Sequence, residues 1–321
     1  MSDRKPSFSQ DMAWRLETIG YDIVTGLVRL LPVDVASDIG AALFKWLGPK
    51  TSLRKLVRKN LDLAFPDKDE AWKARVTIGQ WDNLGRTFAE LIMMDRISVA
   101  NGRIVVDDMQ RLKDVAASGK PVVFISGHFA NFEIMPSAIL EAGIVCQITY
   151  RAINNPYIDK RVRTARARYG VKLFAPKGGD GAKEILAGMA RGESSALMND
   201  QKFNRGVATP FFGRIVETAP GPAKFAQKFG TVLQPMSVHR LDKARFKVIV
   251  HDPLPVDQTG HRARDIETTV CKVSQFIEDV VREHPEEWFW VHKRWPDDAY
   301  RPNDAHQNQA EASEPAEARQ A

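Results

Sequence analysis

Cysteine is scarce in this sequence of 321 residues, which contains only Cys146 and Cys271 and no CxxC pair. Two isolated cysteines without CxxC spacing argue against zinc, redox chemistry and a disulfide framework. A signal peptide is not expected either, because polar residues rather than an apolar segment follow Met1. The hydrophobic content of 44% and the charged content of 27% are ordinary for a globular chain. We therefore expect a folded intracellular protein.

Long apolar runs are also lacking. The most apolar stretch is 23–47, and a membrane-spanning helix needs ~20 mostly apolar residues. Four charged residues interrupt the stretch: Arg29, Asp34, Asp38 and Lys45. We predict two amphipathic helices, over about 13–31 and 34–47, separated at Pro32. Two further helices are predicted over 52–63 and 69–95. This pattern favours peripheral or monotopic membrane attachment of the first 100 residues over insertion.

Positive charge is concentrated near the end of this segment. The chain has 46 Lys+Arg and 40 Asp+Glu, a net charge of +6 at pH 7, and the stretch 45–59 has six cations and no acidic residue. In 53–61 the apolar positions share one helical face, which is typical of a helix lying on an anionic surface. A solvated basic face on a soluble domain is the alternative. A nucleic-acid partner is not expected, because no nucleic-acid-binding module accompanies the charge.

From about residue 102 the pattern changes to short β-branched runs that alternate with helical stretches. The predicted strands are 122–126, 146–150, 171–174, 195–198, 232–239 and 246–251, and the predicted helices are 131–142, 155–168, 179–191, 219–229 and 261–283. Such alternation predicts an α/β fold, a mainly parallel mixed sheet flanked by helices, over 101–300. The last residues, 301–321, lack apolar runs and are expected to be a disordered tail.

The most informative chemistry lies where the first predicted strand ends, at Gly127-His128, before a helix expected to start near Asn131. Glu133 is five residues after His128, which is not the i, i+4 spacing of a helical metal site, so no metal is expected there. If Glu133 folds back to accept the Nδ1–H of His128, Nε2 is left as a general base. The alternative is a histidine that caps a helix, with Glu133 complementing the helix dipole.

Other catalytic motifs are missing. The chain has no G-x-S-x-G elbow, no G-x-x-x-x-G-K-[ST] loop and no G-x-G-x-x-G after the first strand. A histidine base without a protein nucleophile nearby indicates that the substrate supplies the nucleophile, for example a hydroxyl. Direct group transfer is the reaction type that follows.

The segment from His128 to Glu133 resembles the H-x4-[D/E] motif of the lysophospholipid acyltransferase superfamily, and within it the late lipid A acyltransferases of the lauroyl/myristoyl type. The resemblance covers about residues 10–300. Further segments in the family's order and spacing support it: Tyr150-Arg-Ala-Ile-Asn-Asn-Pro156, Arg166-Ala-Arg168, Asn199-Asp200-Gln201, Pro210-Phe-Phe-Gly213, Thr218-Ala-Pro-Gly221 and Trp290-Val-His-Lys-Arg-Trp295.

The resemblance implies acyl transfer from acyl carrier protein to a hydroxyl of a lipid A precursor of the Kdo2-lipid IVA type, at the cytoplasmic face of the inner membrane, without cofactor or metal. His128 would act as general base and Glu133 would orient it. Arg166 would stabilise an oxyanion or a phosphate, and Asp200 would position substrate or support the site. The helix of Arg166 is crowded with the basic residues Lys160, Arg161, Arg163 and Arg168, and these neighbours could instead meet lipid phosphates or the acidic carrier protein. Asp200 could cap the loop before Phe203.

Some alternatives stay open at this stage. The segment 210–213 lines an acyl pocket or belongs to the core, and the tryptophans of 288–295 form an interfacial belt or core. Pro136 predicts a bend or a shortened first turn in its helix. The rival functions are an acyltransferase acting on a lysophospholipid or another hydroxylated lipid, and a catalytically inactive lipid-binding protein.

Overall fold

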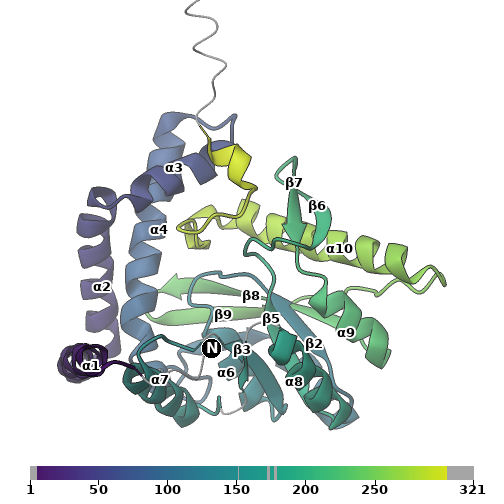
Figure 1. Ribbon diagram of the computed structural model, residues 1–321, viewed down its shortest axis with the longest axis horizontal. Coiled ribbons are helices and arrows are strands. Elements are labelled where there is room, and N and C mark those ends of the chain that lie inside the picture. Colours follow the sequence, from purple (N-terminus) through teal and green to yellow (C-terminus); the bar gives the residue numbers. More distant parts are fainter. Residues whose placement is uncertain (1–5, 151, 172–173, 177–178, 302–321) are drawn as a thin grey trace, which may run out of the picture.

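The computed structural model of the protein describes residues 6–150, 152–171, 174–176 and 179–301 (Figure 1). Within these residues one sheet of seven strands has the order β1-β9-β8-β2-β5-β3-β4. All neighbouring pairs in it are parallel except β8 and β9. The strands are β1 (Ile104–Asp107), β2 (Val123–Ser126), β3 (Cys146–Tyr150), β4 (Phe174–Pro176), β5 (Ser194–Met198), β8 (Leu233–Asp242) and β9 (Arg245–Val250). The prediction of a mainly parallel mixed sheet is confirmed.

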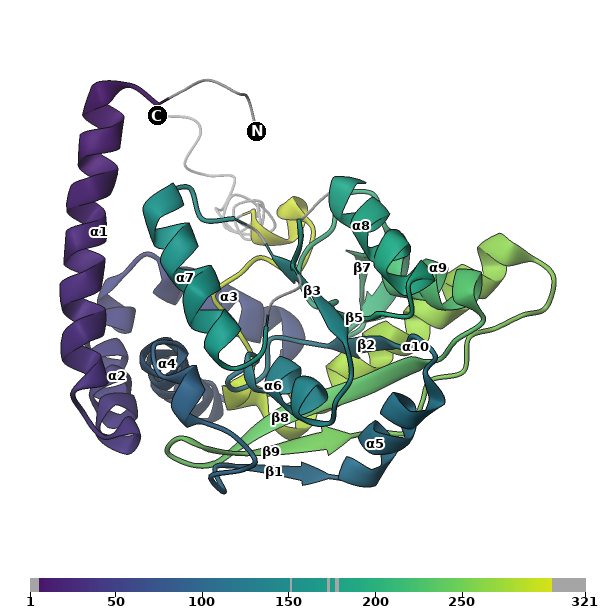
Figure 2. The same cartoon turned by 90° about the horizontal axis from the view of Figure 1, so that it is seen from below.

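Helices cover both faces of this sheet. Along the central strand β2, Val123 and Ile125 pack into one core and Phe124 into the other, because alternate side chains of a strand point to opposite faces. The first core receives α8 (Gly179–Ala190), α9 (Gly221–Phe229) and α10 (Arg262–Glu283), and the second receives α5 (Met109–Ser118) and α6 (Ile134–Glu141). Figure 2 shows α6 and α10 on opposite sides of the sheet. Buried strand residues explain why these strands read as continuous apolar runs.

Four helices precede the sheet: α1 (Phe8–Arg29), α2 (Val33–Leu47), α3 (Leu53–Ala64) and α4 (Glu70–Leu91). They stand together along one side of the molecule (Figure 1). Helices α2 and α4 approach so closely that a Cβ on Gly40 would lie 2.3 Å from the carbonyl oxygen of Gly85. Glycine at both positions is therefore a steric requirement of this helix pair.

Helix α1 turns its polar side toward the protein. Four polar pairs bind it to the rest of the chain: Asp11 with Tyr157, Glu17 with Asn155, Asp22 with Arg161, and Arg29 with Asp95. Its apolar side faces outward, so that Leu16 is 63% exposed and Leu27 60%. The exposed apolar surface continues on α2 with Ile39 and Trp46. Among the described residues, no helix has the length and apolarity to cross a membrane.

The expectation for the basic segment 53–61 was wrong in one respect. Val57 and Leu61 of α3 are fully buried in the core, so its apolar face packs against the protein instead of an anionic surface. Arg58 forms ion pairs with Asp62 and Glu70. The exposed surface of α3 consists mainly of Arg54, Lys55 and Arg58, together with Leu53 (39% exposed), which favours the alternative interpretation of a basic face on the domain surface.

Several elements differ from the sequence-based expectation. Strand β1 and helix α5 were missed, and so was the hairpin of β6 (Val207–Phe211) and β7 (Arg214–Thr218) that packs on α10. Helix α1 starts earlier than predicted, and α4 ends earlier. Short 3-10 helices lie at η1 (Gly48–Lys50), η2 (Met94–Arg96), η3 (Pro285–Glu287) and η4 (Asp297–Tyr300). Residues 172 and 173 of one predicted strand and the predicted tail beyond Arg301 lie outside the described residues.

Two of the open alternatives are decided by burial. Phe211 is 0% and Phe212 6% exposed, so the two phenylalanines of the segment 210–213 belong to the core, whereas Pro210 and Gly213 are exposed. Trp288, Trp290 and Trp295 are each at most 1% exposed and pack against one another, so they form core and not an interfacial belt.

Buried Glu90 of α4 joins the N-terminal helices to the sheet. It is 0% exposed and accepts hydrogen bonds from Ser37 of α2 (2.7 Å), Asn131 (3.0 Å) and both Nη atoms of Arg240 on β8 (2.5 and 3.1 Å). A buried carboxylate is tolerated because it is paired and its oxygens are hydrogen-bonded. The loop that follows His128 is thereby attached to α2, α4 and β8 through one side chain.

We expect Glu90→Ala to lower the free energy of unfolding by about 3–5 kcal/mol, because it leaves Arg240 buried without a counter-charge. Urea denaturation followed by tryptophan fluorescence measures this. The control is Glu184→Ala, which removes an exposed ion pair with Arg191 (3.3 Å) and is expected to cost at most about 1 kcal/mol. Equal losses in the two variants would contradict the role assigned to Glu90.

Candidate active site

The loop between β2 and α6 places His128 at the carboxyl end of the central strand. A Cβ on Gly127 would lie 2.6 Å from the ring of Phe129, so only glycine fits there. Ala130 adopts a left-handed backbone conformation with φ of 43°. Its N–H donates to the carbonyl of Glu287 (2.8 Å), and its carbonyl accepts from Thr87 (3.1 Å). Contacts on both sides therefore hold the loop in a conformation that it would not adopt alone.

Helix α6 starts at Ile134, three residues later than predicted. Pro136 then falls in the first turn, where a helix needs no backbone N–H, so the late start of the helix accommodates the proline. Glu133 becomes the N-cap residue, and its side chain makes no cap hydrogen bond. Its carboxylate is thus free to reach another part of the chain.

His128 is oriented by Asp200, which follows β5. Asp200 Oδ1 lies 2.7 Å from His128 Nδ1, and Oδ2 accepts the backbone N–H of His128 at 2.8 Å. Since an ionised carboxylate only accepts hydrogen bonds, Nδ1 carries the proton. Among the described residues, Nε2 has no hydrogen-bond partner, so its lone pair is available.

Asp200 is 0% exposed, yet it stays ionised. Burial raises the pKa of Asp200, but the charge and the hydrogen bonds of His128 outweigh burial and hold that pKa below its usual range. Trp288 Nε1 donates to Oδ2 (2.9 Å), and His292 Nε2 lies 3.1 Å from the backbone carbonyl. Asp200 therefore binds His128 and does not cap the loop before Phe203.

The hydrogen bond expected between Glu133 and His128 is replaced by another. The carboxylate of Glu133 accepts two hydrogen bonds from the guanidinium of Arg166, one of them at 3.1 Å from Nε, and a third from the hydroxyl of Tyr169 at 2.7 Å. The prediction was wrong because Asp200, 72 residues away along the chain, occupies the Nδ1 side of the imidazole. Tyr169 was missed, although its position three residues after Arg166 places both on one face.

Arg166 lies on α7 (Pro156–Arg168), which Asn155 caps by accepting the N–H groups of Tyr157 and Ile158. Burial lowers the pKa of Arg166, but the nearby carboxylate of Glu133 outweighs burial and raises it, so the guanidinium stays charged. The guanidinium also lies 4.9 Å from the ring centre of Tyr150. Among the described residues its Nη1 makes no hydrogen bond, so donors remain for a ligand.

A cavity of about 260 Å³ brings these groups together. His128, Glu133, Arg166 and Gln201 line it with polar atoms. The remaining wall is mainly apolar and consists of Phe132, Met135, Pro136, Ile148, Thr149, Tyr150, Ala196 and Met198. Asp200 stands behind His128 and does not line the cavity. The four residues predicted for the site therefore occupy one region, three at the cavity and one behind it.

The fold and this arrangement place a histidine paired with a buried aspartate, and an arginine paired with a glutamate, around one cavity of an α/β protein. A His–Asp pair with a free Nε2 suits proton abstraction from a substrate hydroxyl. The sequence profile of the bacterial lipid A biosynthesis acyltransferases matches residues 3–297. The chain belongs to this family, and it is an acyltransferase of lipid A biosynthesis. The inactive lipid-binding alternative is thereby set aside.

Two individual proteins can be compared with the chain. The lipid A biosynthesis lauroyltransferase of Escherichia coli (strain K12) is 26% identical over 283 residues, which cover 85% of this chain and 89% of that protein. The crystal structure of the 1-acyl-sn-glycerophosphate acyltransferase PlsC from Thermotoga maritima is 11% identical, and the match covers 80% of this chain and 100% of that one with a TM-score of 0.38. That likeness is too weak to locate any residue of the site.

We expect Asp200→Asn to change the tautomer of His128, because an amide at this place can present its NH₂ to Nδ1 and so favour the Nε2–H form. Nitrogen chemical shifts of the imidazole, assigned with a His128→Gln variant, measure the tautomer. Glu133→Gln is the matched control and is expected to leave the shifts of His128 nearly unchanged. The opposite pattern would show that Glu133, not Asp200, orients the imidazole.

Proposed function

We propose that this enzyme transfers an acyl chain from acyl carrier protein to a hydroxyl of a Kdo2-lipid IVA-type lipid A precursor, with His128 as general base. The observation that carries the proposal is the His128–Asp200 pair, whose free Nε2 lies at a cavity with an apolar wall. Such a wall suits an acyl chain, whose burial is favourable by about 0.8 kcal/mol per CH₂. Family membership supplies the acceptor class.

The chemistry follows from the arrangement. Nε2 of His128 takes the proton of the acceptor hydroxyl as its oxygen attacks the thioester carbonyl carbon. The resulting oxyanion is stabilised by a nearby donor, and Arg166 is the charged candidate at the cavity. The C–S bond then breaks, and His128 returns the proton to the departing thiolate. Asp200 stabilises the imidazolium formed in between and keeps Nδ1 protonated throughout.

Glu133 orients Arg166 in this proposal, whereas the sequence led us to expect that it orients His128. Its carboxylate holds Arg166 and Tyr169 in place, so it acts on the reaction through the guanidinium. A bidentate arginine–carboxylate pair fixes the plane of the guanidinium as well as its position. Glu133 is therefore a positioning residue for Arg166, and Asp200 is the positioning residue for His128.

The surface around Arg166 suits an acidic donor protein. In α7, all of which is described, no residue is fully buried. Lys160, Arg163 and Arg168 are exposed on it, while Arg161 is paired with Asp22. A basic surface beside the cavity would steer an acidic carrier protein toward it.

The outward apolar face of α1 and α2 supports attachment to the inner membrane from its cytoplasmic side. Polar pairs occupy the protein-facing side of α1, which leaves its apolar side for the acyl layer. Trp46 is 61% exposed, and the ammonium of Lys50 lies 3.6 Å from its ring centre. A tryptophan and a lysine at the edge of an apolar face are typical of the membrane–water interface.

The reaction is tested by mass spectrometry of the lipid A precursor after incubation with purified enzyme and acyl carrier proteins that bear chains of different lengths. We expect a mass gain of one acyl chain, with rates about 10²–10⁴-fold lower for His128→Ala because the general base is lost. Parallel incubations replace the precursor by a lysophospholipid. Acylation of the lysophospholipid alone would contradict the proposed acceptor, and an unimpaired His128→Ala variant would contradict the proposed base.

A double-mutant cycle separates the two carboxylates. We expect Glu133→Gln and Arg166→Gln to be non-additive in log(kcat/KM), since they break the same ion pair, whereas Glu133→Gln and Asp200→Asn are additive. Non-additivity between Glu133 and Asp200 would return Glu133 to the role of orienting His128.

Membrane attachment is tested by co-sedimentation with vesicles of phosphatidylethanolamine and phosphatidylglycerol. We expect the combined variant Leu16→Ser, Ile23→Ser and Leu27→Ser to release the protein, since burial of each side chain contributes about 1.5–3 kcal/mol. The matched control is Ile215→Ser with Leu241→Ser, which changes apolar residues of similar exposure (61% and 58%) away from α1. Equal release by both sets, or by neither, would contradict the assignment of this face.

A further inference from the structure

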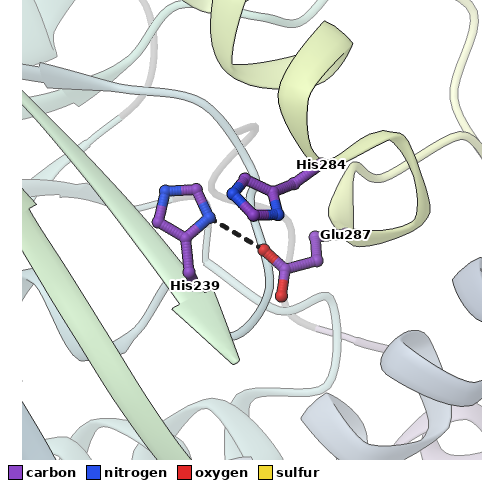
Figure 3. A group of neighbouring side chains, drawn as sticks. All are labelled: His239, His284 and Glu287. Atoms are coloured by element: carbon purple, nitrogen blue, oxygen red, sulfur yellow. Dashed lines mark hydrogen bonds and ion pairs between the residues drawn. The ribbon is translucent and has the colours of Figure 1, made fainter. Parts of the chain in front are cut away.

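A second group of chemically capable side chains lies apart from the His128 cavity. His239 is on β8, His284 follows α10, and Glu287 ends η3 (Figure 3). One ligand atom of each lies within 4.8 Å of the others, and this is the one such trio of His, Cys, Asp or Glu side chains found in the described part of the chain. Nδ1 of His239 is 3.0 Å from Oε2 of Glu287, and the rings of His239 and His284 are 4.1 Å apart.

We propose that His239, His284 and Glu287 bind a divalent zinc ion. Two imidazoles and one carboxylate form a ligand set that Zn²⁺ uses with a fourth, open position. Ligand atoms at about 2.0–2.2 Å from a tetrahedral ion are roughly 3.3 Å from one another. The 3.0 Å between His239 Nδ1 and Glu287 Oε2 is close to that value. The ion would take the place of the proton that these two atoms share, and His284 would close in by a small rotation.

The surroundings of the trio favour coordination. Glu287 Oε1 accepts the N–H of Arg240 at 2.8 Å, which leaves Oε2 for the ion. Nε2 of His239 lies 2.8 Å from Ser237 Oγ, which in turn lies 2.8 Å from Nε2 of His251. When the ion takes the Nδ1 lone pair, His239 carries its proton on Nε2 and donates it to Ser237. Ser237 can then donate to His251, so every polar atom keeps a partner. Such outer hydrogen bonds orient metal ligands.

The site has a route for entry. The side chains of His239 and Glu287 are 8% and 9% exposed, whereas that of His284 is 36% exposed. An ion can therefore reach the buried pair from the side of His284, and the open fourth position would hold water. Zinc there would join β8 to the segment after α10. That segment also holds the His128 loop, because Ala130 donates its N–H to the carbonyl of Glu287.

The experiment uses the full chain after a chelator has removed bound metal ions. Co²⁺ is titrated into this protein, and its d–d absorption reports a site of nitrogen and oxygen ligands with low coordination number. Zn²⁺ is then added to displace the bound Co²⁺. We expect one ion per chain. We expect His284→Asn and Glu287→Gln each to weaken Co²⁺ binding. Loss of an outer-sphere partner weakens metal binding roughly 10–100-fold, and loss of a direct ligand should weaken it at least as much. The variants Glu286→Gln and His261→Asn serve as controls, because each changes an exposed residue outside the trio, and they should leave Co²⁺ binding unchanged.

Absence of a saturable Co²⁺ spectrum in the wild type would overturn the proposal, as would unchanged affinity in His284→Asn. Circular dichroism establishes that each variant is folded. If Glu287→Gln fails to fold, His284→Asn decides the question, because His284 is half-buried and its replacement removes only an exposed contact with Glu283 (3.8 Å) and the ring contact with His239. These readouts do not depend on acyltransferase activity.

Discussion

The arrangement of the active site depends on the burial of one carboxylate. Asp200 has no solvent contact, and a buried anion is stable only when donors surround it. Here the donors are the backbone and the imidazole of His128 and the indole of Trp288, and both residues lie far from Asp200 and from each other along the chain. The same requirement therefore fixes the loop after β2, the end of β5 and the segment after η3 relative to one another. The tautomer of His128 is a consequence of this anchoring and not a separate feature.

The second carboxylate of the motif has a different electrostatic setting. Asp200 faces a histidine that would gain and lose a proton in the proposed reaction, whereas Glu133 faces Arg166, which stays charged. Two anions near one imidazole would both stabilise its protonated form and make it a poor proton donor to the leaving group. Pairing Glu133 with Arg166 neutralises one of them. The five-residue spacing of His128 and Glu133 then places the proposed base and an oriented guanidinium at the same cavity.

The sequence predicted the strongly periodic parts of the fold well and the long-range contacts poorly. The apolar patterns of buried strands such as β2 and of long helices such as α10 predict these elements directly. Strand β1 has four residues and β6 contains Pro210, so neither produces a clear signal. All four predicted site residues lie together. The sequence-based prediction took Glu133, the acidic residue nearest along the chain, as the partner of His128, whereas the structure has Asp200 there. Spacing along a chain cannot show that β2 and β5 are neighbours in the sheet, and it cannot show that His239 and Glu287 meet.

Helix α1 lies between α7, which carries Arg166, and the outward apolar surface of the N-terminal helices. It contacts α7, the helix that carries Arg166, and its bonds to Tyr157, Asn155 and Arg161 are all polar. A helix that packs by its polar side and exposes its apolar side is unstable as a free surface in water. Contact with an acyl layer, as proposed, would remove that cost and leave the polar bonds to α7 intact. The layer would then lie beside the helix that borders the cavity, so a lipid acceptor could reach His128 without leaving it completely.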